Sequence, residues 1–123
     1  MKKMKEFRKI SVIGLGLIAS SICLTLRQKD PTIKLVGYDK DKVVRNRAKK
    51  IGLCKVESNL DNAVSGSQLI VLCVPVGQMQ AVTRRLKKNI EPGTTITDVG
   101  SVKLSVIEEI ERKRSVYAKL KVI

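Results

Sequence analysis

The feature that most constrains the fold is a glycine-containing turn close to the start of the chain. The segment "SVIGLGLIASS", residues 11–21, is an apolar run that leads into Gly14 and Gly16, with Ala19 three residues after the second glycine. This spacing matches the pattern G-x-G-x-x-G/A, in which the first glycine permits a tight turn, the second lets the backbone approach a pyrophosphate, and the third small residue lets a helix pack closely on its strand. A plain strand-to-helix turn carries similar glycines, so the surrounding pattern has to distinguish the two interpretations.

Beyond this turn, β-like apolar runs alternate with helical patterns along the whole chain. The run 67–76 is apolar without alternation, as a central parallel strand buried on both faces should be. Asn59 is a candidate helix cap, Gly52 a helix stop and Ser101 a cap for the last helix. The pattern predicts strands at 9–16, 33–39, 53–58, 67–76 and 95–100, and helices at 17–29, 40–52, 59–66, 77–90 and 101–114. Such alternation predicts an α/β fold: one doubly wound parallel sheet of Rossmann type, over residues 1–123, with helices on both faces.

In this context the glycine turn follows the first strand and opens the first helix, which favours dinucleotide binding. The helix N-terminus offers N–H groups and a partial positive charge to a pyrophosphate. Asp39 ends the second strand, 23 residues after Gly16, near the spacing of about 20 residues expected for the acid that binds the ribose hydroxyls. Its carboxylate would repel a 2′-phosphate, so NAD is expected rather than NADP, although Lys40 and Lys42 weaken that preference. The alternative is an ordinary turn aspartate.

The charge balance points to an anionic ligand. The chain has 25 Lys and Arg against 11 Asp and Glu, a formal net charge of +14. Nucleic acid is the obvious candidate partner, but the basic residues are spread along the chain and aromatic residues make up only 2%. Because no nucleic-acid-binding motif accompanies the charge, we expect a basic surface and no nucleic-acid partner.

Length, hydropathy and cysteine content limit the class of protein. At 123 residues, 43% of them hydrophobic, the chain should form one folded domain. Its apolar runs fall short of the roughly 20 residues that span a bilayer, so we expect no membrane association. Cys23, Cys54 and Cys73 are odd in number, widely spaced and set in apolar surroundings. This pattern indicates reduced, buried thiols in the cytoplasm and neither a disulfide framework nor a metal site.

Four segments occur in an order that narrows the family. They are "GLGLIAS", "GYD", "LIVLCVPVG" and "ITDVGSVK". Together they resemble the nucleotide-binding domain of prephenate and arogenate dehydrogenases, enzymes that make the tyrosine precursor by NAD(P)-dependent oxidative decarboxylation of a cyclohexadienyl dicarboxylate. The resemblance extends over about residues 8–110, and "TDVGSVK" after "VPVG" is its most specific part.

The resemblance implies roles for particular residues. Ser101 would be the catalytic-site residue near the nicotinamide and the substrate, with Lys103 in the same helix start; a plain helix cap is the alternative, and the two roles can coexist. The ends of the strands, where ligands of doubly wound sheets bind, carry the remaining expected contacts. The cofactor-binding residues would be Gly14, Leu15, Gly16, Leu17, Ile18, Asp39, Val74, Pro75 and Val76.

The chain also departs from this family. Members continue into a Gly-Gly-His-Pro segment, whose histidine polarises the substrate hydroxyl, and into a helical second domain, whereas this chain has no histidine. We therefore expect the cofactor-binding part of such an enzyme, catalytically incomplete by itself, which takes a dicarboxylate substrate only when a second domain completes it. The cleft face would be left uncovered and would favour self-association, through Val74, Pro75, Val76, Val106, Ile107 and Ile110.

Two alternatives compete with this interpretation. Tyr117 and Lys121 form the Tyr-x-x-x-Lys pair of short-chain dehydrogenases, but the glycine motif of that family has three residues between its first two glycines. A second function class is a regulatory NAD-sensing module, like the domains attached to potassium transporters. The "TDVGSVK" segment favours the dehydrogenase, because a sensor has no evident need for a serine beside the nicotinamide.

Overall fold

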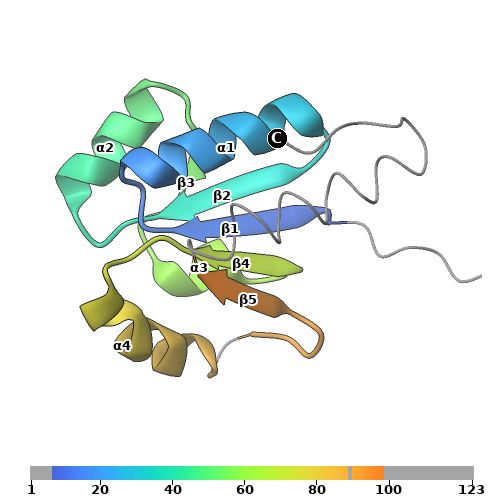
Figure 1. Ribbon diagram of the computed structural model, residues 1–123, viewed down its shortest axis with the longest axis vertical. Coiled ribbons are helices and arrows are strands. Elements are labelled where there is room, and N and C mark those ends of the chain that lie inside the picture. The colour runs from blue at the N-terminus through green and yellow to red at the C-terminus, as the bar shows by residue number, and fades with distance from the viewer. Residues whose placement is uncertain (1–6, 89, 99–123) are drawn as a thin grey trace, which may run out of the picture.

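Strands and helices alternate strictly along the chain in the computed structural model, which describes residues 7–88 and 90–98. All pairings within its five-stranded sheet are parallel, and the strand order is β3-β2-β1-β4-β5 (Figure 1). The elements are β1 (Lys9–Ile13), α1 (Leu17–Lys29), β2 (Lys34–Tyr38), α2 (Lys42–Lys50), β3 (Lys55–Val56), α3 (Leu60–Val64), β4 (Leu69–Leu72), α4 (Val76–Leu86) and β5 (Thr95–Asp98). The predicted doubly wound α/β fold is confirmed; the helix predicted at 101–114 lies outside the described residues.

The two central strands carry the apolar runs that a sheet covered on both faces requires. All four residues of β4 are buried, as its unbroken apolar sequence predicts. In β1, Val12 faces one helical layer and Ile13 the other, because successive side chains of a strand alternate between faces. Burying each such side chain contributes about 1.5–3 kcal/mol, so these strands organise both halves of the core.

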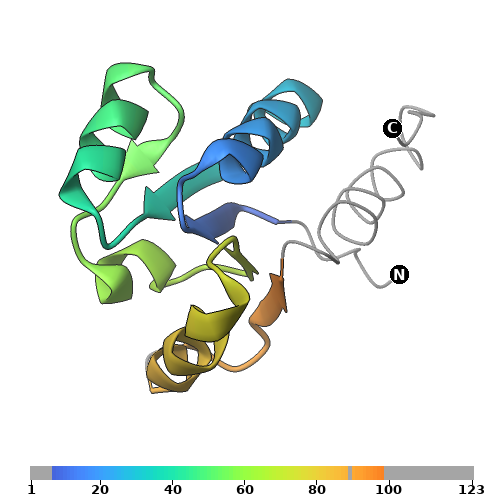
Figure 2. The same ribbon diagram turned by 60° about the vertical axis from the view of Figure 1, so that its left-hand side comes forward.

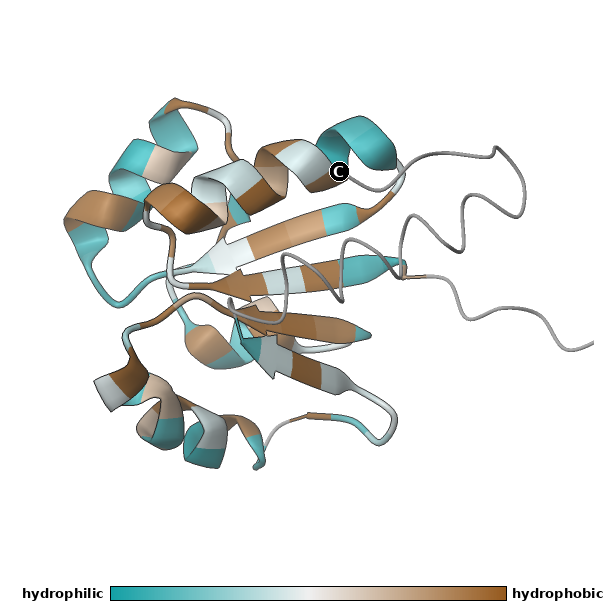
Figure 3. Cartoon of the chain, in the orientation of Figure 1, coloured by the Kyte–Doolittle hydropathy of each residue, from teal (hydrophilic) through white to brown (hydrophobic). Residues whose placement is uncertain are grey.

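Each face of the sheet has its own core. Helices α1 and α2 cover one face, where Ile22, Cys23 and Leu26 of α1 are buried. Helices α3 and α4 cover the other face, where Ala63 of α3 and Leu86 of α4 are buried (Figure 2). The hydrophobic residues accordingly gather on the strands and on the sheet-facing sides of the helices (Figure 3).

The register of the strand pairs aligns the carboxyl ends of β1, β2 and β4. Ile13 at the end of β1 pairs with Tyr38 of β2 on one side and with Leu72 of β4 on the other. The carboxyl ends of three neighbouring strands therefore meet at one edge. The loops that follow them lie next to one another although they are far apart in the sequence.

Local signals at the helix ends explain where the helices begin and stop. Asp41 caps α2 by accepting a hydrogen bond from the Val43 N–H at 2.8 Å, and Asn59 caps α3 by accepting one from the Asn62 N–H at 3.1 Å, as predicted for Asn59. Gly52 follows α2 with a φ of 68°, which confirms it as the helix stop. By contrast, no described side chain caps α1, whose first position is preceded by Gly16.

Two predictions need correction. The third strand has two residues instead of the predicted six, because β3 is an edge strand that pairs only with Val36 and Gly37 of β2. The prediction of three buried thiols is right for Cys23 alone. Cys54 and Cys73 are half-buried, because both lie in loops at strand ends, and all three thiols are free.

The helices are short. The longest described one, α1, has 13 residues and thus a length of about 20 Å, whereas a bilayer core is about 30 Å thick. Within residues 7–88 and 90–98 no helix is long and apolar enough to cross a membrane.

Candidate functional site

A cavity of about 500 Å³ opens at the carboxyl edge of the sheet, above the ends of β1, β2 and β4. Its size lies in the range typical of small-molecule and cofactor sites, about 300–1,000 Å³. The chain leaves β1 toward one face of the sheet and β4 toward the other, so the cavity sits at the point where the strand order reverses. Among the predicted contact residues, its lining includes Gly14, Gly16, Asp39, Val74 and Pro75.

Gly14 is the residue that makes the turn above β1 possible. Its φ is +95°, and a Cβ added there would lie 2.6 Å from the carbonyl oxygen of Cys73. Its N–H donates to the Tyr38 carbonyl at 2.7 Å. The backbones of β1, β2 and β4 therefore approach one another at a point where only glycine fits.

Gly16 has a different role, since its φ of −80° suits any residue. A Cβ added there would meet no described atom within 4 Å, so the absent side chain leaves open space at the cavity wall. The first turn of α1 begins here without a side-chain cap, and its N–H groups and partial positive charge suit an anion. Ala19, the third small residue of the pattern, is only 1% exposed in the core, where α1 packs on the sheet.

Asp39 faces the glycine turn from the end of β2. Its Oδ2 accepts a hydrogen bond from the Leu15 N–H at 2.9 Å, and its Oδ1 accepts one from the Asp41 N–H at 2.8 Å. These two bonds fix the orientation of the carboxylate. Each oxygen of an ionised carboxylate has two lone pairs, so Asp39 can accept further hydrogen bonds from the hydroxyls of a ligand.

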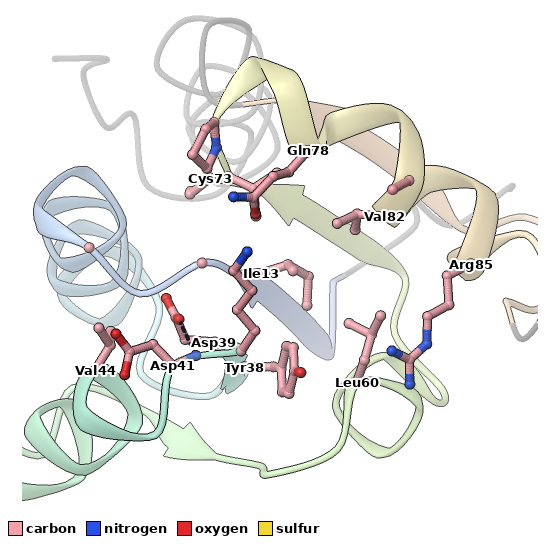
Figure 4. Close-up of a pocket in the computed structure, with 16 residues that line it drawn as sticks. Ile13, Tyr38, Asp39, Asp41, Val44, Leu60, Cys73, Gln78, Val82 and Arg85 are labelled. Atoms are coloured by element: carbon pink, nitrogen blue, oxygen red, sulfur yellow. Dashed lines mark hydrogen bonds between the residues drawn. The ribbon is translucent and has the colours of Figure 1, made fainter.

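The opposite wall is one face of α4. Gln78, Ala81, Val82 and Arg85 line the cavity at helical spacing, and the side chains of Gln78, Val82 and Arg85 lie across from Asp39 and Asp41 (Figure 4). This wall was not predicted. The i, i+3, i+4, i+7 spacing was visible in the sequence, but it could not be assigned to a ligand cavity without the strand order.

The floor of the cavity was also missed. Tyr38 and Leu60 lie between the two walls (Figure 4), and Ile13, Lys40, Asp41, Val44 and Cys73 complete the lining. Burial raises the pKa of the Cys73 thiol to about 11. Cys73 therefore lines the cavity as a neutral group at physiological pH.

Four of the residues predicted to contact the cofactor are not part of the cavity lining. Leu15 is buried and supplies its backbone N–H to Asp39. Leu17, Ile18 and Val76 are 87%, 58% and 86% exposed and do not line the cavity. The residues predicted further along the chain lie outside the described part: Ser101, Lys103, Val106, Ile107, Ile110, Tyr117 and Lys121.

Within the described ranges, no three His, Cys, Asp or Glu side chains gather closely enough to hold a metal ion. The polar groups at the cavity are backbone N–H groups, carboxylates, an amide and cationic side chains.

Comparison with protein families gives a match to the model described as "Prephenate dehydrogenase, nucleotide-binding domain" over residues 22–120. The matched segment begins within α1, after the glycine turn, and covers 99 of the 123 residues.

Two curated relatives are similar to most of the chain. The chain is 37% identical over 109 residues to a cyclohexadienyl dehydrogenase of Zymomonas mobilis, which covers 88% of this chain and 37% of that protein. It is 36% identical over 106 residues to a prephenate dehydrogenase of Lactococcus lactis, which covers 82% of this chain and 28% of that protein. The chain thus spans about a third of the length of these relatives.

Solved structures share the fold. A prephenate dehydrogenase from A. aeolicus, in complex with hydroxyphenyl propionate and NAD+, superimposes with a TM-score of 0.71 at 21% identity, over 90% of this chain and 40% of that one. An arogenate dehydrogenase from Synechocystis superimposes with a TM-score of 0.68 at 28% identity, over 87% of this chain and 38% of that one.

Proposed function

Because this chain belongs to the prephenate dehydrogenase family, whose nucleotide-binding domain it matches over most of its length, we propose that the cavity beside the glycine turn binds NAD. The contact between the Leu15 N–H and the Asp39 carboxylate carries this proposal. It places an acidic acceptor for ribose hydroxyls directly beside a helix start that suits a pyrophosphate.

Each part of the dinucleotide has residues of matching chemistry. The pyrophosphate would lie on the first turn of α1 at Gly16, and the adenosine ribose at Asp39. The adenine would lie along the α4 wall with Gln78 and Arg85, and the nicotinamide would extend toward Val74. Bound NAD would supply the hydride acceptor of the reaction. The chain's own residues bind and orient it.

We also propose that NAD binds more tightly than NADP. Asp39 is held in place by two backbone N–H groups, and a fixed carboxylate at this position repels the additional phosphate on the 2′-oxygen. Asp41 and Lys40 also line the cavity, both are exposed, and their opposite charges offset each other. The basic residues nearby, Lys40 and Lys42, are exposed, so solvent screens their attraction for that phosphate.

The family to which the chain belongs also suggests an activity for the whole enzyme. We propose that the chain is the cofactor-binding part of an oxidoreductase that oxidatively decarboxylates a cyclohexadienyl dicarboxylate, prephenate or arogenate. The names of the Zymomonas mobilis and Synechocystis relatives support this substrate class. Ser101 would lie near the nicotinamide. A regulatory NAD-sensing module is not favoured, because the matched family is one of dehydrogenases.

The state of the cysteines bears on the cellular location of the protein. Three cysteines are free in the structure, and free thiols are typical of reducing compartments. We propose a cytoplasmic location on this basis.

Calorimetric titration of the 123-residue chain with NAD and with NADP tests the cofactor assignment. We expect saturable binding of NAD and weaker binding of NADP. Asp39→Asn, which keeps the shape of the side chain, should weaken NAD binding by about tenfold, because a charged hydrogen-bond acceptor is lost, and should weaken NADP binding less. Glu91→Gln removes the same charge from an exposed loop outside the cavity and should change neither affinity. Equal affinities of the unmodified chain for the two nucleotides would contradict the role of Asp39.

A further inference from the structure

Arg45 on α2 is tied to the backbone of the acidic loop that follows β2. Its Nη1 donates to the Asp39 carbonyl at 2.8 Å and to the Lys40 carbonyl at 3.2 Å. The side chain is half-buried. A guanidinium holds its donors in a rigid planar arrangement, so these two bonds fix the peptide units on both sides of Lys40.

The same loop is held from its other side by the glycine turn. The Gly14 N–H donates to the Tyr38 carbonyl, and the Leu15 N–H donates to the Asp39 carboxylate. The loop is therefore clamped between the glycine turn and α2. Asp39 takes part in both halves of the clamp, with its carboxylate toward the turn and its carbonyl toward Arg45.

From the sequence alone, Arg45 looks like a phosphate-binding residue. It belongs to a basic run after Asp39 that also contains Lys40, Lys42 and Arg47, and arginines near this position are able to accommodate a 2′-phosphate. The geometry points to a different role. Arg45 donates one hydrogen bond to the carbonyl of Asp39, the residue whose carboxylate would repel that phosphate, and a second to the carbonyl of Lys40.

We propose that Arg45 is a positioning residue that sets the preference of this site for NAD over NADP by holding the Asp39 loop. The inference rests on the proposed cofactor function. Ribose hydroxyls that donate to Asp39 would use the lone pairs that the Leu15 and Asp41 N–H groups leave free on its two oxygens. The bonds from Arg45 end on main-chain carbonyls and leave those lone pairs available. They keep the carboxylate in the cavity, where it receives the ribose and excludes a 2′-phosphate.

The test compares Arg45→Gln with Arg47→Gln in the 123-residue chain. Both variants remove one positive charge from α2, but the Arg47 side chain is exposed, so Arg47→Gln controls for the long-range loss of charge. We expect Arg45→Gln to weaken NAD binding by about tenfold and NADP binding by much less, so that the ratio of the two affinities falls. Arg47→Gln should leave that ratio unchanged.

The opposite sign would overturn the proposal. If Arg45→Gln weakens NADP binding more than NAD binding, then Arg45 contacts the 2′-phosphate and does not act through Asp39. If both affinities fall equally, its role is structural alone, because general loosening of the loop does not distinguish the two nucleotides. A chain that binds neither nucleotide before substitution contradicts the proposed function itself. A chain that binds NAD preferentially, and keeps that preference in Arg45→Gln, contradicts only this inference.

Two further variants distinguish the proposed role of Arg45 from a general loss of structure and from a purely electrostatic effect. Arg45→Lys keeps the charge but lacks the planar group that reaches both carbonyls, so we expect it to restore the affinity ratio only in part. Full restoration would show that charge alone suffices and would overturn the proposal. In an Asp39→Asn background, Arg45→Gln should change NAD affinity little further, because the two residues act through one interaction. Additive losses would contradict that dependence.

Discussion

Ile13 and Leu72 occupy paired positions at the carboxyl ends of β1 and β4, and beyond this pair the chain turns to opposite faces of the sheet. The glycine turn follows Ile13 and leads to α1 on one face. The loop with Val74 and Pro75 follows Leu72 and leads to α4 on the other. The space that opens between the two departing segments is the cavity. Its existence is therefore a consequence of topology, and the residues around it determine what it binds.

The turn at Gly14 should tolerate no side chain. Gly14→Ala is expected to lower the free energy of unfolding by about 2–5 kcal/mol, because a non-glycine residue at positive φ costs about 1–2 kcal/mol and overpacking adds about 1–3 kcal/mol. Urea unfolding followed by circular dichroism measures the change. Gly52→Ala is the matched control, since Gly52 also has a positive φ but a Cβ there meets no described atom within 4 Å. It should cost only the strain; equal losses in the two variants would show that the Cys73 carbonyl is not an obstacle.

Gly16→Ala should weaken NAD binding and leave the stability of the fold almost unchanged. Its φ suits alanine and its Cβ has room, so we expect the free energy of unfolding to change by less than about 1 kcal/mol. NAD binding should weaken by more than tenfold, since the methyl group would occupy the space through which a pyrophosphate approaches the helix start. Unfolding and calorimetric titration of the same preparation test both halves. Unchanged NAD affinity would place the pyrophosphate elsewhere.

The half-buried thiol of Cys73 should make stability fall at high pH. Burial raises the pKa of this thiol in the folded protein to about 11 from its ordinary value of 9.0, so the unfolded chain loses the proton first. The stabilising contribution is full below about pH 9 and is lost as the pH rises through about 11. Unfolding measured between these pH values should show a decline that is smaller in Cys73→Ala. An identical decline in both proteins would assign it to other groups.

Exposed apolar side chains around the cleft should promote self-association. Leu17 at the start of α1 and Val76 at the start of α4 are both almost fully exposed. We expect light scattering from the 123-residue chain to rise with ionic strength, as salt screens the repulsion due to the net charge of +14. Leu17→Lys and Val76→Lys should reduce it. Ile51→Lys, at a position 62% exposed after the last residue of α2 and outside the cavity lining, adds the same charge at the opposite end of that helix, and an equal reduction there would argue against a specific cleft face.

The 123 residues alone should not oxidise prephenate or arogenate at an enzymatic rate. They contain no histidine, and general acid–base catalysis contributes typically 10²–10⁴-fold to such rates, roughly the range lost without a suitable group. NADH formation in the presence of NAD and either substrate measures this directly. Steady turnover at about one per second, within the ordinary range of enzymes, would show that another residue supplies the proton transfer.

Features set by local sequence were predictable. The glycine spacing, the Asn59 cap and the Gly52 stop depend on residues within one turn of each other, and the structure has each of them in place. The doubly wound parallel sheet was also predictable, because alternating strands and helices leave few right-handed arrangements. Asp39 could be placed at the correct edge of the sheet for the same reason.

Features that depend on packing were not predictable. Leu15 and Asp39 are 24 residues apart, and no local pattern indicates that a backbone N–H of the turn donates to that carboxylate. The basic run after Asp39 gives no sign that Arg45 turns toward carbonyls. The α4 wall and the half-burial of Cys54 and Cys73 likewise depend on which element lies opposite, which the sequence does not specify.

The missing cap at the start of α1 implies a trade-off between stability and function. A capping side chain in place of Gly16 would stabilise the start of α1 by roughly a few tenths of a kcal/mol relative to glycine, but it would direct its oxygen at the N–H groups that are suited to bind an anion. The empty protein is therefore less stable than this fold permits. Engineering this chain for thermal stability by adding a cap at position 16 would therefore be expected to block the anion site at the start of α1.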